Sequence, residues 1–139
     1  LGRRQRQRRT MTQAFPVAQV LAVAAGAAAG GIVRWLCGAA LNTLHSHIVL
    51  GTLAVNCVGG LLVGLALVWF EHTPNEVLRL LAVTGFLGGL TTFSSFSGES
   101  LLLLQRGQWG WAIAHTLAHV LGALAFAAIG FRLGRALWG

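Results

Sequence analysis

The chain has 139 residues, of which 55% are hydrophobic and only 9% are charged. Soluble domains carry about a quarter charged residues, so this composition excludes a soluble enzyme and indicates an integral membrane protein. Ten basic residues, all arginine, face three acids, which first suggests a binder of anions or nucleic acid. Five of the ten fall within the first nine residues, so the rest of the chain is nearly neutral and we expect no nucleic-acid partner.

Residues 1–10 form a basic N-terminal arm. Three interpretations are open: attraction to lipid headgroups, a disordered tail, or upstream sequence that is not native. Met11, which is followed by Thr-Gln-Ala-Phe-Pro, could be the true start and favours the third interpretation. Residues 11–139 are then predicted to form a single membrane domain.

Four apolar runs are long enough to cross a bilayer as helices, which takes about 20 residues. The first ends at Arg34 and a neighbouring tryptophan, a basic and aromatic pair suited to the membrane interface. The loops between the runs are short and leave no room for a soluble domain. We therefore predict an all-α integral membrane protein with four transmembrane helices, at about residues 15–35, 48–70, 79–103 and 109–133.

The third span contains the sequence Gly88-Gly89-Leu90-Thr91-Thr92 at mid-membrane. Adjacent glycines and β-branched threonines lower helix propensity, so we expect the helix to be broken there. Non-helical backbone at this depth is tolerated only where it is buried or lines a cavity. An unwound segment frees carbonyl oxygens for a hard cation such as Na⁺, and Thr91 or Thr92 could cap the restarted helix.

Polar side chains inside the membrane are costly and tend to mark function. Asn56 in the second span either ties two helices together or lines a pathway. Phe93 and Phe96 follow the predicted break, and their ring edges carry partial positive charge that can stabilise an anion. Ser94 and Ser95 add hydroxyl groups to the same lining.

His115 and His119 are four residues apart in the fourth span, so they share a helix face. Such a pair can bind a metal ion, but the sequence shows no partner carboxylate beside it. Polar lining of a pathway, or hydrogen bonding between helices, is therefore the favoured interpretation of these two side chains.

Small residues at spacings such as Gly26-xxx-Gly30 and Gly60-xxx-Gly64 let helix backbones approach closely in lipid. They could pack the monomer alone, but nineteen glycines also favour an interface between subunits. Outside the arm, three arginines are predicted on one side of the membrane and two on the other. This difference gives only a weak preference for one orientation of the chain in the membrane. The chain could then insert both ways and pair antiparallel, although a native arm would count against this.

Three segments resemble those of the small fluoride channels called Fluc or CrcB. They are GGIVRW at residues 30–35, GTLAVN at residues 51–56 and GFLGGLTTFSSF at residues 85–96. The third segment, with the second at the right distance before it, is highly specific, and the similarity covers residues 15–134. The resemblance implies a fluoride-selective ion channel that exports cytoplasmic fluoride down its gradient and so lowers fluoride toxicity.

The resemblance also implies an antiparallel dual-topology homodimer in the inner (plasma) membrane. A central structural Na⁺, which is not transported, would be held by the backbone carbonyls of Gly88 and Thr91. Arg34 matches the family's basic vestibule residue, and Glu99 matches its acid near the pore. The implied lining of the fluoride pore is Asn56, Phe93, Ser94, Ser95 and Phe96, to which we add Thr92, His115 and His119 as further predicted pore residues. The two histidines depart from the family, whose members carry tyrosine and serine there.

Two other functions are alternatives. A small dual-topology multidrug transporter has a similar size but depends on a glutamate in its first span, and residues 15–33 contain no acid. A non-transporting subunit of a membrane complex would not need the costly break in the third span. No nucleophile and base are paired in the sequence, so we predict that the protein is not an enzyme.

Overall fold

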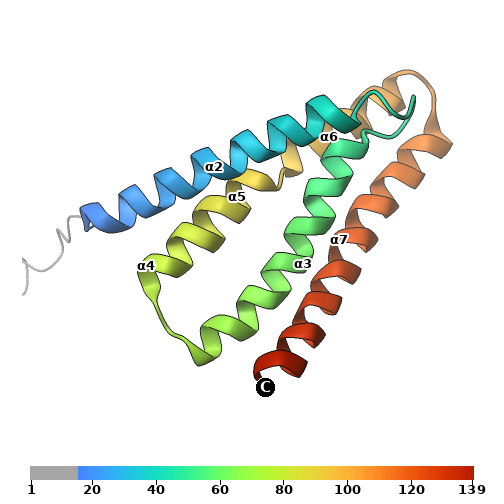
Figure 1. Ribbon diagram of the computed structural model, residues 1–139. Helices are drawn as coiled ribbons and strands as arrows, with labels where there is room; N and C mark the ends of the chain where they lie inside the picture. The colour runs from blue at the N-terminus through green and yellow to red at the C-terminus, as the bar shows by residue number, and fades with distance from the viewer. Residues whose placement is uncertain (1–15) are drawn as a thin grey trace, which may run out of the picture.

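The computed structural model describes residues 16–139, and all regular secondary structure within them is helical (Figure 1). The predicted arm at residues 1–10 and the start at Met11 lie outside this part. The elements are α2 Val17–Leu41, α3 Leu50–His72, α4 Glu76–Arg79, the π-helix η1 Leu80–Leu87, α5 Gly88–Leu90, α6 Phe93–Gln105 and α7 Trp109–Trp138.

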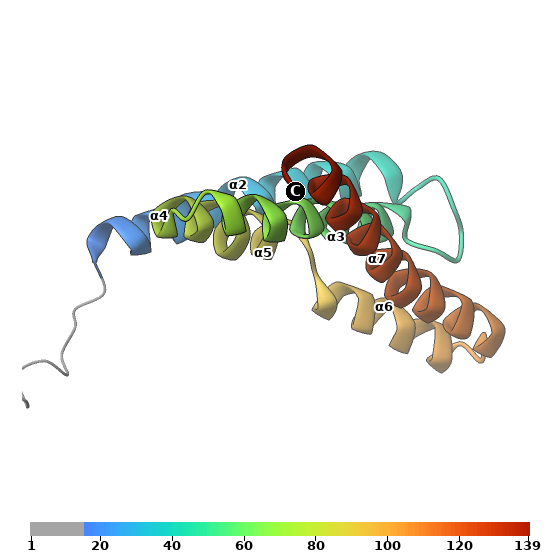
Figure 2. The same cartoon turned by 90° about the horizontal axis from the view of Figure 1, so that it is seen from below.

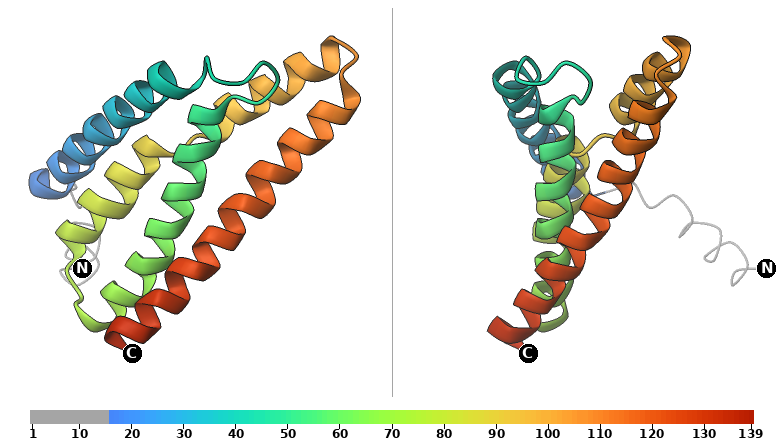
Figure 3. Two further views of the ribbon diagram at one scale, coloured as in Figure 1. Left: turned by 45° about the vertical axis from the view of Figure 1, so that its right-hand side comes forward. Right: turned by 90° about the vertical axis from the view of Figure 1, so that its right-hand side faces the viewer.

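Four segments of the described chain are long and apolar enough to cross a membrane. They are Val17–Leu41, Leu50–His72, Glu76–Gln105 and Trp109–Trp138. The prediction of an all-α chain with four spans is confirmed. The turns at residues 42–49 and 106–108 lie at one end of the molecule, and the turn at 73–75 lies with the C-terminus at the other (Figure 3).

Two predicted helix ends are wrong. The first helix does not stop at Arg34 but continues to Leu41, and Arg34 lines a hollow between helices. The fourth span continues past residue 133 to Trp138. There the Arg135 side chain pairs with Glu71 of α3 at 2.9 Å. The arginine is thus accommodated within the helix and does not mark its end.

The break in the third span is narrower than predicted. Gly88 has helical dihedral angles, φ −63° and ψ −36°, and α5 continues to Leu90. Only Thr91 and Thr92 are extended, with ψ values of 155° and 117°. Gly89 serves packing instead, since a Cβ atom there would collide with the carbonyl oxygen of Ala27 in α2.

The helices pack in two groups, and glycines lie at the closest contacts within each group. α3 lies mainly against α7, and α2 lies mainly against η1 and α5. A Cβ atom at Gly60 would collide with the Ala123 carbonyl of α7, and one at Gly26 would collide with the Leu81 carbonyl of η1. The two glycine spacings therefore pack helices within one chain, and their use at a subunit interface stays a prediction.

After Thr91 and Thr92 the chain changes partners. α6 leaves the layer formed by α2 and α5 and runs beside α7, as the view from below shows (Figure 2). The extended pair thus lets one span contact α2 with its first half and α7 with its second half. This geometry places the start of α6 next to polar side chains of both α3 and α7.

Candidate functional site

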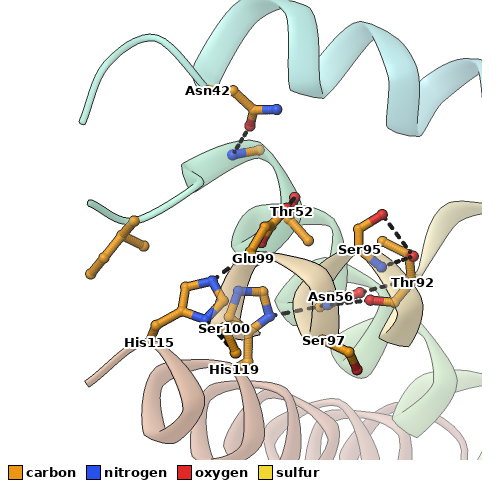
Figure 4. A network of polar contacts seen from close by, with 12 residues as sticks. Asn42, Thr52, Asn56, Thr92, Ser95, Ser97, Glu99, Ser100, His115 and His119 are labelled. Atoms are coloured by element: carbon orange, nitrogen blue, oxygen red, sulfur yellow. Dashed lines mark hydrogen bonds and ion pairs between the residues drawn. The ribbon is translucent and has the colours of Figure 1, made fainter. Parts of the chain in front are cut away.

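The site is built around the break, where the side chain of Asn56 of α3 forms hydrogen bonds with the backbone of Thr92 (Figure 4). The Asn56 Oδ1 atom accepts a hydrogen bond from the Thr92 N–H at 2.8 Å. Its Nδ2 atom donates to the Thr92 carbonyl at 3.1 Å and also lies 3.1 Å from His119 Nδ1. The two backbone bonds fix which end of the amide carries the oxygen, so His119 Nδ1 must accept.

Thr92 also begins α6. Its Oγ1 atom accepts a hydrogen bond from the Ser95 N–H at 3.1 Å, which is the usual interaction of an N-cap threonine. Thr91 instead donates its hydroxyl to the Leu87 carbonyl at 2.8 Å. Of the two threonines that could cap the restarted helix, Thr92 is the one that does.

Two backbone carbonyls at the break lose the donors that a continuous α-helix would supply. In such a helix the N–H of Thr92 would bond to the Gly88 carbonyl, and the N–H of Ser95 to the Thr91 carbonyl. These N–H groups are directed to Asn56 Oδ1 and Thr92 Oγ1 instead. The carbonyl oxygens of Gly88 and Thr91 therefore lack these helical donors. Such oxygens are hard ligands of the kind that Na⁺ prefers.

An aromatic pair flanks the break. The rings of Phe93 and Phe96 have centroids 5.4 Å apart and are tilted by 59°. Phe96 is buried against His119, with centroids 4.9 Å apart, whereas Phe93 is 78% exposed. A hollow of about 680 Å³ brings together five of the predicted pore residues: Asn56, Thr92, Phe93, Phe96 and His119.

A second hollow, of about 590 Å³, lies on the other side of Thr92. Arg34, Ser95 and Glu99 line it, so the predicted vestibule and acidic residues share one space. Thr52 lines it too and donates to Glu99 Oε1 at 2.6 Å. The sequence places Thr52 one helical turn before Asn56, on the same face of α3, but Thr52 was not among the predicted pore residues.

His115 is fully buried and held at both ring nitrogens. Its Nε2 atom lies 3.2 Å from Glu99 Oε2, and its Nδ1 atom lies 3.1 Å from the Ser100 hydroxyl. The sequence-based view that the histidine pair has no carboxylate beside it is wrong, because α6 brings Glu99 against α7. His115 lines neither hollow but stacks on Phe96, with centroids 5.6 Å apart.

Ser94 is the predicted pore residue least engaged with the others. It is exposed and lines neither hollow. Its hydroxyl lies 3.3 Å from that of Thr92, so its contact with the site runs through this threonine alone.

The sequence of the chain matches that of a known family. The family model described as "CrcB-like protein, Camphor Resistance (CrcB)" matches residues 21–131. The chain belongs to the CrcB family. A CrcB relative from Aromatoleum aromaticum is 51% identical over 123 residues, which cover 87% of this chain and 94% of that protein. One from Escherichia coli is 44% identical over 116 residues, covering 82% and 91%.

Both CrcB relatives are named "Fluoride-specific ion channel FluC". The family resemblance found in the sequence is confirmed, and with its four apolar helices the chain is a multi-pass membrane protein. The relatives are ion channels and not enzymes, as expected. Their names also speak against the two alternatives, a multidrug transporter and a non-transporting subunit.

Proposed function

We propose that this CrcB protein is a fluoride-selective channel that releases cytoplasmic fluoride down its gradient and so lowers fluoride toxicity. One observation carries the proposal: the Asn56 amide and the Phe93 and Phe96 rings gather on one hollow at the break, in a chain whose relatives are named for fluoride. Ring edges and neutral donors attract an anion moderately. Conduction requires binding of this moderate strength, because the ion must also leave.

The polar groups suggest a path for fluoride through the monomer. It begins at the hollow of Arg34, Thr52 and Glu99 and continues to the hollow of Asn56 and His119, with Thr92 lining both. We expect the hydroxyl of Ser95 to contribute on the first side. The path contains one basic residue at its mouth, which would attract an anion without trapping it along the way.

We propose that two copies pair antiparallel as a dual-topology homodimer in the inner (plasma) membrane. The exposure of Phe93 supports this, because an aromatic ring beside the proposed path is left uncovered in one chain. Leu21, Leu124 and many other large apolar side chains are also exposed on the crossing helices, where lipid or a second copy can cover them.

We further propose that a structural Na⁺, which is not transported, binds at the break. The Gly88 and Thr91 carbonyls support it, since their helical donors are engaged elsewhere. A Cβ atom built on Gly88 would meet only the Val83 carbonyl, at 3.9 Å, so the backbone there has open space beside it. The ion would supply positive charge that fixes these carbonyls.

The proposed function predicts that proteoliposomes containing the protein release fluoride rapidly and retain chloride. We expect the Asn56 amide and the phenylalanine ring edges to replace water around fluoride, and the selectivity over chloride is expected from the relatives' naming as fluoride-specific channels. The vesicles are loaded with potassium fluoride or potassium chloride, a potassium ionophore balances the charge, and ion-selective electrodes record efflux. Protein-free vesicles are the control. Absence of fluoride release from a monodisperse, folded preparation would refute the proposal.

The sodium proposal predicts that replacing Na⁺ by a bulky organic cation during purification lowers fluoride efflux by about tenfold or more. Without the ion, the Gly88 and Thr91 carbonyls repel one another and the break loosens. Efflux is recorded as above, and the thermal midpoint of unfolding is measured in parallel. Adding Na⁺ back should restore both. Full activity and unchanged stability in carefully sodium-free buffer would count against the site.

A further inference from the structure

Glu99, His115 and His119 place three metal-ligating groups together from two helices. Glu99 comes from α6 and the two histidines from α7, and their candidate ligand atoms all lie within 4.8 Å of one another. Figure 4 shows both imidazole rings beside the Glu99 side chain. Two imidazoles and one carboxylate are a ligand set that Zn²⁺ accepts, with a fourth position open.

The Nε2 atom of His119 is buried and has no hydrogen-bond partner among residues 16–139. The whole side chain is deeply buried, with 4% of the residue exposed, and its other nitrogen is engaged by Asn56. Buried polar atoms almost always have a partner. An unpartnered ring nitrogen next to a carboxylate and a second imidazole therefore indicates that a ligand belongs between them.

The spacing suits a small cation. Ligand atoms around a tetrahedral zinc ion lie about 3.3 Å apart, because each bond is about 2.0–2.1 Å long. His115 Nε2 and Glu99 Oε2 are already 3.2 Å apart. The largest separation in the group is within 4.8 Å, so closing the site takes side-chain movements of about 1 Å.

Charge and supporting hydrogen bonds point the same way. Within the described chain, Arg79 and Arg135 pair with Glu76 and Glu71. Glu99 has no arginine within ion-pair distance there, although Arg34 lines the same hollow. Thr52 and Ser100 hold the outer atoms of the cluster, at Glu99 Oε1 and His115 Nδ1. Such second contacts orient metal ligands and are a regular part of zinc sites.

We propose that Glu99, His115 and His119 bind a divalent transition-metal ion with the ligand preference of Zn²⁺, and that the bound ion closes the fluoride path. Glu99 lines one hollow and His119 lines the other, so an ion between them sits where the two meet. The closure rests on the proposed function, whereas the binding does not.

Metal binding has a cost that the geometry defines. His119 Nδ1 accepts a hydrogen bond from Asn56, so the neutral ring carries its proton on Nε2. An ion bound at Nε2 moves that proton to Nδ1, where it faces the Asn56 amide nitrogen. The Asn56–His119 hydrogen bond is then lost. An aspartate at this position would accept the Nδ1 proton and favour metal binding.

The test uses Co²⁺ as a spectroscopic probe on the purified full-length protein, with Zn²⁺ as competitor. We expect visible cobalt absorption that Zn²⁺ abolishes, and loss of the absorption in Glu99→Gln and His119→Ala. The double variant His45→Ala/His47→Ala removes two histidines of the loop before α3, one exposed and one half-buried. It is the matched control and should keep the absorption. Asn56→Asp should bind Co²⁺ roughly tenfold more tightly.

The second arm measures fluoride efflux with and without micromolar Zn²⁺, each sample relative to its own metal-free rate. We expect a fall of about tenfold in the unmodified protein and in the loop double variant. No cobalt absorption, or absorption that survives in Glu99→Gln, overturns the metal site. Cobalt binding without any effect of Zn²⁺ on an active channel overturns the closure. Cobalt binding in a protein that never releases fluoride supports the metal site and refutes the proposed function instead.

Discussion

Asn56→Ala is expected to lower fluoride efflux by about tenfold or more and to reduce the free energy of unfolding. The substitution removes the amide that bonds both the N–H and the carbonyl of Thr92. Thr92 is buried, and each buried backbone group left unpaired costs about 1–3 kcal/mol. Electrode recording of efflux and a thermal melt of the purified protein measure the two effects.

A matched control for Asn56→Ala is Asn75→Ala. Asn75 also uses its side-chain oxygen to accept a backbone N–H, that of Leu78 at 3.0 Å, but it does so in the exposed turn before α4. This variant should lose a small amount of stability and keep its fluoride efflux. Equal efflux from the two variants would show that the hydrogen bonds between Asn56 and the Thr92 backbone have no part in conduction.

Gly30→Leu is expected to prevent correct packing of the first and third spans. A Cβ atom at this position would collide with the Phe86 carbonyl and lie 2.7 Å from the Leu90 nitrogen. Both are backbone atoms, so no side-chain rotation relieves the contact. Overpacking of this kind costs about 3 kcal/mol or more. The yield of monodisperse protein on size-exclusion chromatography should fall by about tenfold.

Gly31→Leu tests whether this effect comes from the contact or from leucine in the helix. A Cβ atom on the adjacent glycine would have no atom of the described chain within 4 Å of it, so a larger side chain there meets open space. We expect near-normal yield and thermal midpoint. If Gly31→Leu were as damaging as Gly30→Leu, the close approach of α2 to η1 and α5 would not be the cause.

Much of the fold follows from local sequence, because span length and hydropathy depend on neighbouring residues alone. The ends of two spans could not be predicted in this way. A charged arginine indicates the end of a membrane span unless its ion-pair partner is known. Arg135 has such a partner in Glu71. The glycines at 88 and 89 lower helix propensity, yet both stay helical, and Gly89 lies in close contact with α2. The π-helix at Leu80–Leu87 was not predicted from the sequence.

The candidate site was predictable where its residues are close in the sequence. The Phe93–Phe96 pair follows from spacing, the cap was narrowed to Thr91 or Thr92, and the resemblance to a known family supplied the role of Asn56. The joining of Glu99 to His115 was not predictable, because it depends on how α6 packs against α7. That packing follows from the change of direction at the break, which is a tertiary feature.

The π-helical stretch Leu80–Leu87 has a consequence for changes in chain length. Backbone donors in a π-helix reach five residues back instead of four, so this stretch holds more residues per turn than the rest of the span. Loss of one residue here can be absorbed by a return to ordinary α-helix. The same loss within α3 would rotate every later side chain by about 100°. Single-residue deletions should therefore be tolerated better in this stretch than in α3.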